Sequence, residues 1–241
     1  SSPVIGITLA NFAMLPMVMA GVAFGTLNAL LAALSGTLTM IALTNAFSGG
    51  IFLITIAIPC CFVARYALMN RRTRSGDVGW YPVGSTLAKL TAYGSVLLVL
   101  AAVVNLGVEG GFRGSVERLL SDIFHSRLKL SSQLDYAALL QQIGSYFPSI
   151  VVIVWLLLLS INTILGQALL TWSRMALRPT PNYSFIKAPE WLYWALVGSG
   201  TTALLGNGSL EYISRNLAVV FAAPFFYIGL CIIHVLVRRV S

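Results

Sequence analysis

The sequence predicts an all-α, polytopic transmembrane helical bundle of about six or seven spans, with an external amphipathic helical hairpin. Three observations predict this fold. Hydrophobic residues make up 58% of the 241 residues and charged residues only 9%, and the mean hydropathy of +0.87 lies far above the range of soluble domains. Several apolar runs are long enough to cross a bilayer as helices. The basic residues between these runs gather on one side of the predicted membrane.

Five apolar runs have the length of a membrane span. A helix needs about 20 mostly apolar residues to cross roughly 30 Å of hydrocarbon. The runs that meet this requirement are approximately Leu27 to Phe47, Ile51 to Met69, Leu87 to Leu106, Ser149 to Trp172 and Leu217 to Val237. These five runs form the framework of the predicted bundle.

Two further apolar runs are less regular. The run from Trp191 to Leu205 is short and rich in small residues, so it needs a thinned bilayer, a tilt or flanking protein to cross. We expect it to cross, because otherwise Arg178 and Arg238 could not lie on the same side. Pro16 interrupts the first apolar run. Residues 3–47 therefore hold either two spans with a tight turn or one short broken helix and a long one, and we favour two.

The charged residues predict the orientation of the bundle. One side carries ten basic residues against two acidic ones: Arg65, Arg71, Arg72, Arg74, Lys89, Arg174, Arg178, Lys187, Arg238 and Arg239 against Asp77 and Glu190. The other side carries five of each sign: Arg113, Arg118, Arg127, Lys129 and Arg215, with Glu109, Glu117, Asp122, Asp135 and Glu211. The positive-inside rule makes the first side cytoplasmic. Because this rule explains the net charge of +8, we expect membrane lipids as partners and no nucleic acid.

One long hydrophilic segment, residues 109–147, lies on the outer side as an insertion within a single transmembrane domain of residues 1–241. In residues 115–130, apolar side chains recur at helical spacing, which predicts an amphipathic helix. They are Val116, Leu119, Leu120, Ile123 and Phe124. Residues 135–147 repeat the pattern more weakly, and Pro148 marks the start of the next span. The resulting hairpin either lies at the membrane surface or over the bundle, or forms a lid on an outward-facing cavity.

Small residues recur at every fourth position near the N-terminus: Gly21, Gly25, Ala29 and Ala33. On one helix, this spacing leaves one face with small side chains only. Such a face lets another helix approach closely in lipid. The stripe is a predicted helix-docking face, and it serves either packing within the bundle or docking of a separate membrane protein subunit.

The loop after the second clear span combines arginines with an aromatic pair at the membrane boundary. Its members are Arg65, Arg71, Arg72, Arg74, Trp80 and Tyr81. Aromatic rings favour the interfacial layer, and arginines favour anionic lipid headgroups. The alternative is a conformationally fixed docking surface, because Pro82 and Gly84 restrict the backbone where the next helix begins.

Four polar residues within or at the ends of the spans are candidate sites: Asn105, Asn162, Thr163 and Gln167. Polar groups inside a membrane cost free energy unless they have partners. Thr163 and Gln167 share a helix face at a spacing of four, whereas Asn162 and Gln167 do not. We favour interhelical hydrogen bonding over ligand binding for these side chains.

Enzymatic chemistry has little support in the sequence. The spans contain no paired carboxylates, and the chain has no His/Cys metal spacing, phosphate loop or nucleophile elbow. Seven acidic residues and two histidines leave few acid–base combinations. We therefore expect a non-enzyme with no catalytic residue, metal site or cofactor.

Several short motifs resemble a known family. They are Leu15-Pro16 with Ala20-Gly21 and Gly25, Ile58-Pro59 before Arg65, and Trp80-Tyr81-Pro82-x-Gly84 at the start of a span. These motifs are similar to those of the YybS-like family of multi-pass bacterial membrane proteins. That family is distantly similar to the substrate-binding S components of energy-coupling-factor transporters and to MreD-type cell-shape proteins. The resemblance implies a bundle of six or more helices in the bacterial cytoplasmic (inner) membrane. S components dock on their coupling protein through an Ala-x-x-x-Ala pattern, whose spacing Ala29 and Ala33 match.

Three functional hypotheses follow from different classes of protein, of which the third, lipid handling, rests only on the cytoplasmic arginine–aromatic loops. The first is an S-component-like subunit that binds or transports a small solute in an outward-opening cavity under the external hairpin, and docks through the small-residue stripe. The second is a structural or accessory scaffold subunit of a larger membrane protein complex, which transports nothing. The scaffold hypothesis predicts that the polar groups of the spans are satisfied within the chain.

Overall fold

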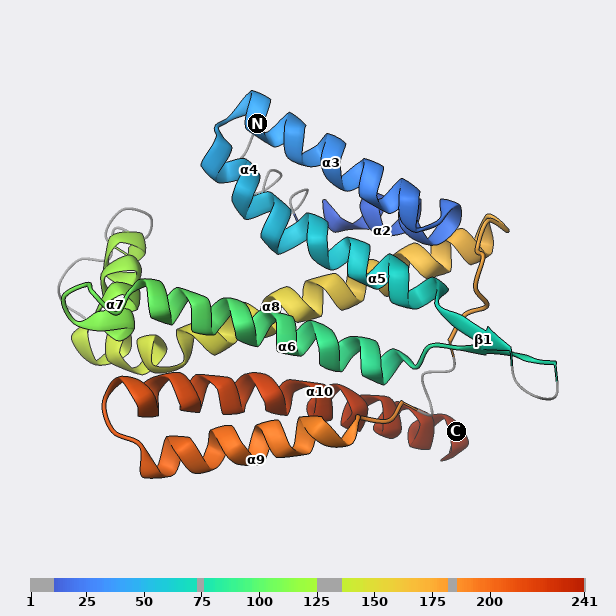
Figure 1. The fold of residues 1–241 in the computed structure, drawn as a ribbon. Coiled ribbons are helices and arrows are strands. Elements are labelled where there is room, and N and C mark those ends of the chain that lie inside the picture. The colour runs from blue at the N-terminus through green and yellow to red at the C-terminus, as the bar shows by residue number, and fades with distance from the viewer. Residues whose placement is uncertain (1–10, 73–75, 125–135, 182–185, 241) are drawn as a thin grey trace. The chain divides into compact units, whose positions relative to one another are not determined.

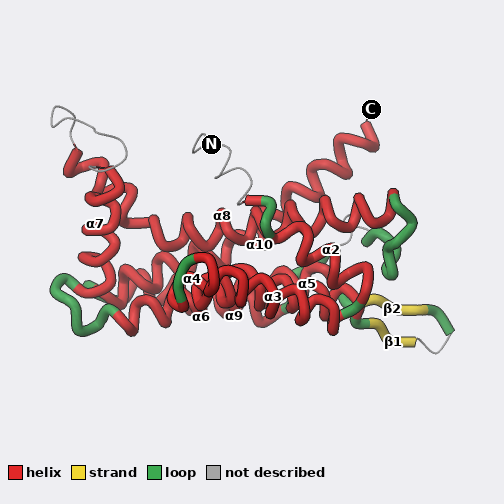
Figure 2. Tube along the Cα trace, turned by 90° about the horizontal axis from the view of Figure 1, so that it is seen from above, coloured by secondary structure: helices red, strands yellow, loops and turns green. Residues whose placement is uncertain are grey.

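The computed structural model describes residues 11–72, 76–124, 136–181 and 186–240. Within these residues the chain is almost entirely helical, and its strands form one short two-stranded sheet (Figures 1 and 2). The predicted all-α fold is confirmed.

Five helical stretches of the described chain are long and apolar enough to cross a membrane. They are Thr26–Leu43, Ala46–Leu68, Val83–Val104, Gln141–Trp172 and Ser209–Cys231. They overlap the five clear spans predicted from the sequence and confirm a polytopic bundle. The two less regular runs form shorter helices, α2 (Met14–Phe24) with 11 residues and α9 (Glu190–Leu205) with 16 residues. Both are shorter than the roughly 20 residues of a full crossing, so a sixth and a seventh span remain predictions.

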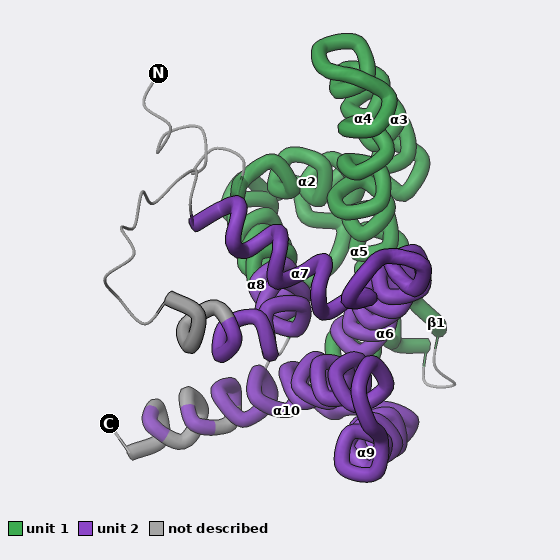
Figure 3. The backbone as a smooth tube through the Cα atoms, turned by 90° about the vertical axis from the view of Figure 1, so that its left-hand side faces the viewer, with its two compact units in different colours: residues 1–86, 157–186 green, residues 87–156, 187–241 purple. Residues whose placement is uncertain are grey.

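The chain's residues group into two compact units, which Figure 3 shows in different colours. Unit 1 comprises residues 1–86 and 157–186, and unit 2 comprises residues 87–156 and 187–241. Two of the three unit boundaries fall within helices α6 (Val83–Val104) and α8 (Tyr136–Trp172), and the third lies between α8 and α9. The assignment of the whole chain to one transmembrane domain stays a prediction.

Unit 1 begins with two helices joined at a glycine. Helix α2 ends at Gly25, whose φ of 96° lies in a region that side chains other than glycine rarely adopt. Helix α3 (Thr26–Leu43) then packs back on α2, and both contact α5 (Ile58–Leu68). The prediction that the small-residue stripe runs along one helix is therefore wrong, because the chain turns at Gly25.

The second long apolar stretch of unit 1 is a helix with a wide turn in its middle. It consists of α4 (Ala46–Phe52), the π-helical turn η1 (Leu53–Ala57) and α5. Asn45 caps its start, since the Asn45 side chain accepts a hydrogen bond of 2.8 Å from the Ser48 amide. The π turn ends at Ala57, two residues before Pro59, and such turns commonly accompany a local irregularity in the helical hydrogen bonds.

A β-hairpin connects α5 to α6. Strands β1 (Asn70–Arg72) and β2 (Val78–Trp80) pair antiparallel, with Arg71 opposite Gly79. The Tyr81 amide extends the ladder by a 2.9 Å hydrogen bond to the Met69 carbonyl. The sequence predicts a loop here, and Asn-Arg-Arg has the low strand propensity that leaves such a hairpin without a sequence signal.

Unit 2 contains the amphipathic helix α7 (Gly111–Ile123) and the hairpin of α9 and α10 (Ser209–Val240). Val116 and Leu120 lie on the buried side of α7, which confirms the amphipathic helix for the described part of residues 115–130. Residues 125–135 lie outside the described residues. The predicted boundary at Pro148 is wrong: α8 runs from Tyr136 to Trp172 with Pro148 inside it.

Candidate functional site

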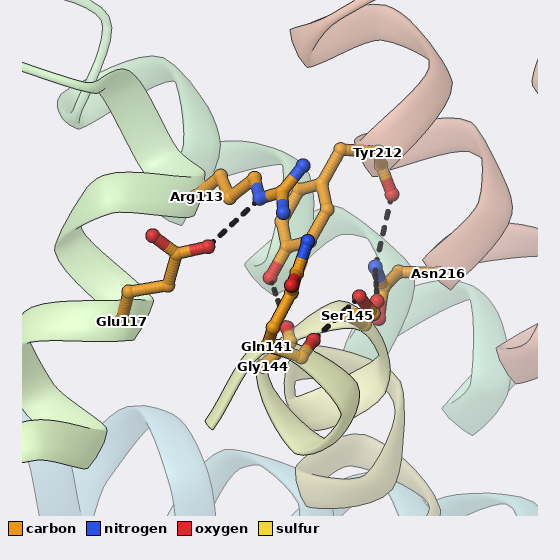
Figure 4. A network of polar contacts seen from close by, with 7 residues as sticks. All are labelled: Arg113, Glu117, Gln141, Gly144, Ser145, Tyr212 and Asn216. Atoms are coloured by element: carbon orange, nitrogen blue, oxygen red, sulfur yellow. Dashed lines mark hydrogen bonds and ion pairs between the residues drawn. The ribbon is translucent and has the colours of Figure 1, made fainter. Parts of the chain in front are cut away.

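Helix α8 contains a gap in its backbone hydrogen bonding at Pro148. Proline has no N–H, so the carbonyl of Gly144, four residues earlier, lacks its helical donor. The Tyr212 hydroxyl of α10 donates to that carbonyl at 2.7 Å (Figure 4). Tyr212 is only 2% exposed, so water does not compete for the bond. A tyrosine of a neighbouring helix thus replaces the missing amide.

Asn216 lies one turn after Tyr212 on α10 and bonds to the next backbone hydrogen-bonding pair of α8. Its Nδ2 donates to the Ser145 carbonyl at 3.1 Å (Figure 4). Its Oδ1 accepts from the Ser149 amide at 3.0 Å. In a regular helix the Ser149 amide donates to the Ser145 carbonyl, so the Asn216 amide serves both groups of that step. Asn216 is 0% exposed. We call Gly144, Ser145, Ser149, Tyr212 and Asn216 the proline-gap network.

Helix α7 packs beside the proline-gap network. The Phe112 ring meets the Tyr212 ring edge to face at 6.0 Å between centroids. A Cβ placed on Gly144 would lie 3.6 Å from side-chain atoms of both Glu117 and Leu120. These contacts match the interpretation of an amphipathic helix packed over other helices. The Arg113–Glu117 ion pair of 2.8 Å in Figure 4 is exposed, so it adds little stability.

Unit 1 contains a second buried polar cluster, centred on Arg178. The Arg178 side chain is 8% exposed and donates to the Ala67 carbonyl at 3.2 Å and the Tyr81 carbonyl at 3.1 Å. Its guanidinium lies 5.6 Å from the centre of the Trp80 ring, within the range of a cation–π contact. The Gln167 side chain donates to the Arg178 carbonyl at 2.9 Å. We call these five residues the Arg178 node.

The Arg178 node joins three segments of unit 1. Ala67 lies in the last turn of α5, where unpaired carbonyls carry partial negative charge, and Tyr81 follows strand β2. Sequence reasoning placed Arg178 only among the basic residues. Its contacts could not be read from the sequence, since backbone carbonyls occur at every position and leave no signature.

The loop that combines arginines with an aromatic pair has two parts: the aromatic residues contact other segments of unit 1, and the described arginines are exposed. Trp80 and Tyr81 belong to the Arg178 node, and the Tyr81 ring lies 5.1 Å from the Tyr66 ring. In contrast, Arg65, Arg71 and Arg72 are exposed. Arg74 lies outside the described residues.

The small-residue stripe faces the chain's own helices. Ala29 and Ala33 are 2% and 5% exposed, and the Cys61 thiol donates to the Ala29 carbonyl at 3.6 Å. A Cβ on Gly21 would collide with the side chains of Ala64 and Ala29, while Gly25 makes the turn. This is the internal-packing alternative, so docking of a separate protein through this face loses its support.

The four candidate polar side chains all donate hydrogen bonds within the chain. Asn162 bonds to the Leu158 carbonyl at 2.7 Å and to the Asn11 carbonyl at 2.9 Å. Gln167 bonds to the Arg178 carbonyl, as described above. Thr163 and Asn105 each bond at 2.7 Å to the carbonyl four residues earlier. Only Asn162 and Gln167 therefore connect segments distant along the chain.

The described residues contain no set of side chains suited to binding a metal ion. No group of three or more His, Cys, Asp or Glu side chains there could hold a metal ion. The three cysteines, Cys60, Cys61 and Cys231, are free thiols.

A protein-family model with the description "Predicted membrane protein (DUF2232)" matches residues 1–241. The chain belongs to this family. The family description agrees with the five long apolar helices, and together they identify a multi-pass membrane protein. No curated protein and no solved structure matches the sequence. The polar clusters of this DUF2232 protein are therefore interpreted from their own geometry.

Proposed function

We propose that this DUF2232 protein is a non-enzymatic accessory subunit of a larger membrane protein complex. One observation carries the proposal: buried polar side chains of the apolar helices hydrogen-bond to the chain's own backbone. Asn216 and Tyr212 bond to α8, and Gln167 bonds to the segment after α8. In a membrane, polar side chains mark function by default. Here their function is to hold helices and loops in place.

A solute site needs convergent polar groups that the protein leaves available. Asn216 instead uses both its amide nitrogen and its amide oxygen on backbone groups. The outer side of α3 is formed by exposed leucines: Leu27, Leu30, Leu31, Leu34 and Leu38. Such a surface suits lipid and apolar partner helices. Among the exposed polar side chains of α3, Asn28, Ser35 and Thr39 donate hydrogen bonds to backbone carbonyls three or four residues earlier.

The experiment that tests this proposal is native mass spectrometry of the protein extracted from its own membrane in lipid particles. The accessory-subunit proposal predicts a second polypeptide at fixed stoichiometry and no stoichiometric small molecule other than lipid. A single chain that carries one non-lipid solute per copy would contradict it. Wild type and Asn105→Leu should behave alike, since Asn105 bonds only to its own helix.

A second candidate function is the S-component-like solute-binding subunit that the family resemblance implies. The observation in its favour is the buried Oδ1 of Asn162, which accepts no hydrogen bond from the described residues. If a solute supplied that donor, Asn162→Leu would abolish solute-dependent thermal stabilisation. The Thr163→Val variant is the control, because the Thr163 hydroxyl bonds only to its own helix.

We further propose that the β-hairpin lies on the cytoplasmic side of a bacterial inner membrane. The excess of basic residues on that side supports this orientation. Arg72→Cys and Arg118→Cys in a background without the native cysteines test it. An impermeant maleimide should label Arg118→Cys in intact cells, and Arg72→Cys only after permeabilisation. The reverse pattern would invert the topology.

A further inference from the structure

Strands β1 and β2 carry exposed positive charge between two candidate spans. From Arg65 to Tyr81 the chain has four arginines and one acid, Asp77. Arg71 and Arg72 are exposed. Because both side chains are exposed to solvent, their guanidinium groups are accessible to an external anion.

The position of the hairpin relative to the membrane follows from the helices on either side of it. Helix α5 ends at Leu68, directly before β1, and α6 begins at Val83, soon after β2. Both helices belong to candidate membrane spans. The layer just beyond the end of a span contains the lipid headgroups. Strand β1 begins two residues after the end of α5, and β2 ends three residues before the start of α6, so the base of the hairpin lies at that layer.

The register of the strands places one arginine on each face. Adjacent residues of a strand point to opposite faces. Arg72 pairs with Val78 on one face, and Arg71 pairs with Gly79 on the other. Trp80, two residues after Val78, shares the face of Arg72. A ribbon that docks flat on a protein would concentrate its contacts on one face, whereas a ribbon that stands among headgroups meets phosphate on both.

The base of this ribbon is held in place before any ligand binds. Arg178 bonds to the carbonyls of Ala67 and Tyr81, one on each side of the hairpin. Its guanidinium also lies against Trp80. Because the base is fixed, binding costs less conformational entropy than it would for a free loop.

We propose that strands β1 and β2 form a binding site for anionic phospholipid headgroups. Arg71 and Arg72 bind phosphate groups on opposite faces of the ribbon, and Trp80 lies at the border of the hydrocarbon. The guanidinium fork suits phosphate, because its N–H groups match two phosphate oxygens. This site is independent of the accessory-subunit function, since it concerns lipid selectivity rather than a partner subunit.

Lipid competition tests the proposal. The full-length protein in detergent receives equimolar phosphatidylglycerol and phosphatidylcholine with the same acyl chains, and native mass spectrometry measures the ratio of the two lipids retained. Wild type should retain phosphatidylglycerol preferentially. The preference should fall about fivefold for Arg71→Gln or Arg72→Gln and more than tenfold for the double variant. Arg71→Lys/Arg72→Lys should keep an intermediate preference, since lysine attracts phosphate without the fork.

The control is Arg113→Gln/Arg118→Gln, which removes the same charge from α7. Its preference should equal that of wild type. Equal retention of the two lipids by wild type, an unchanged preference in the hairpin double variant, or an equal loss in the control would each overturn the proposal. A hairpin double variant that keeps the lipid preference of wild type but loses binding to an acidic protein or to an oligonucleotide would also overturn it. Unchanged circular dichroism and size-exclusion profiles show that the exposed substitutions leave the fold intact.

Discussion

The proline-gap network of unit 2 and the Arg178 node of unit 1 perform the same physical task with different chemistry. Each supplies side-chain donors to backbone carbonyls that lack a helical partner. The phenol and the amide of the proline-gap network both lie in the candidate span Ser209–Cys231, while Arg178 lies outside all five spans. An arginine in the middle of a span costs about 3 kcal/mol, and a neutral amide costs less. In these two clusters, the charged donor is the one that lies outside the candidate spans.

The largest expected effect comes from placing a charge in the neutral cluster. Asn216→Asp replaces the donor to the Ser145 carbonyl with an oxygen and places a carboxylate at a position that is 0% exposed. The free energy of unfolding in mixed detergent micelles at neutral pH should fall by about 4 kcal/mol. The control is Asn105→Asp, at a partly exposed position, which should cost at most about 1 kcal/mol. An equal loss of unfolding free energy at Asn216 and Asn105 would contradict this comparison.

Removing the charge from the Arg178 node should have the next largest effect on the free energy of unfolding. Arg178→Met keeps the length of the side chain and removes the two bonds to the Ala67 and Tyr81 carbonyls. We expect a loss of about 3 kcal/mol, because bonds from a charged donor are the stronger ones. Arg65→Met on exposed α5 surface should change the free energy of unfolding by less than about 0.5 kcal/mol. A cost for Arg178→Met as small as that of the control would show that the node adds no stability.

Deleting the amide without adding a charge sharpens the comparison further. Asn216→Leu leaves the Ser145 carbonyl and the Ser149 amide without their bridge and should cost about 2 kcal/mol. The matched Asn105→Leu variant loses only a bond within its own helix and should cost less than about 0.5 kcal/mol. Urea- or SDS-induced unfolding followed by circular dichroism measures both. If Asn216→Leu were neutral, α8 would have closed its own hydrogen bond at this step.

The sequence predicts the helices well because membrane spans require long apolar runs, which are local features. It predicts turns and gaps less well. The sequence predicts a tight turn within residues 3–47, but Gly25 fits a small-residue stripe as well as it fits a turn, so the pattern does not place the turn at Gly25. Pro148 predicts a helix boundary by the usual rule, but donors from α10 allow α8 to continue through it.

The candidate site was predictable only where residue type carries the signal. The exposed arginines and the aromatic pair could be identified from charge and position. Tyr212 and Asn216 were not identified, because the predicted span began at Leu217 and left both outside it, whereas α10 starts at Ser209. Their partners are backbone groups exposed by a proline in a distant segment. Such pairs become visible only when the fold brings the segments together.

The claim that α10 replaces the backbone donor lost at Pro148 is tested most directly by a double-mutant cycle. Tyr212→Phe removes the hydroxyl that bonds to the Gly144 carbonyl and should cost about 1 kcal/mol. Pro148→Ala restores an amide that can donate to the same carbonyl. In that background, Tyr212→Phe should cost less than about 0.3 kcal/mol, which gives a coupling energy well above zero. An identical cost in both backgrounds would contradict the account.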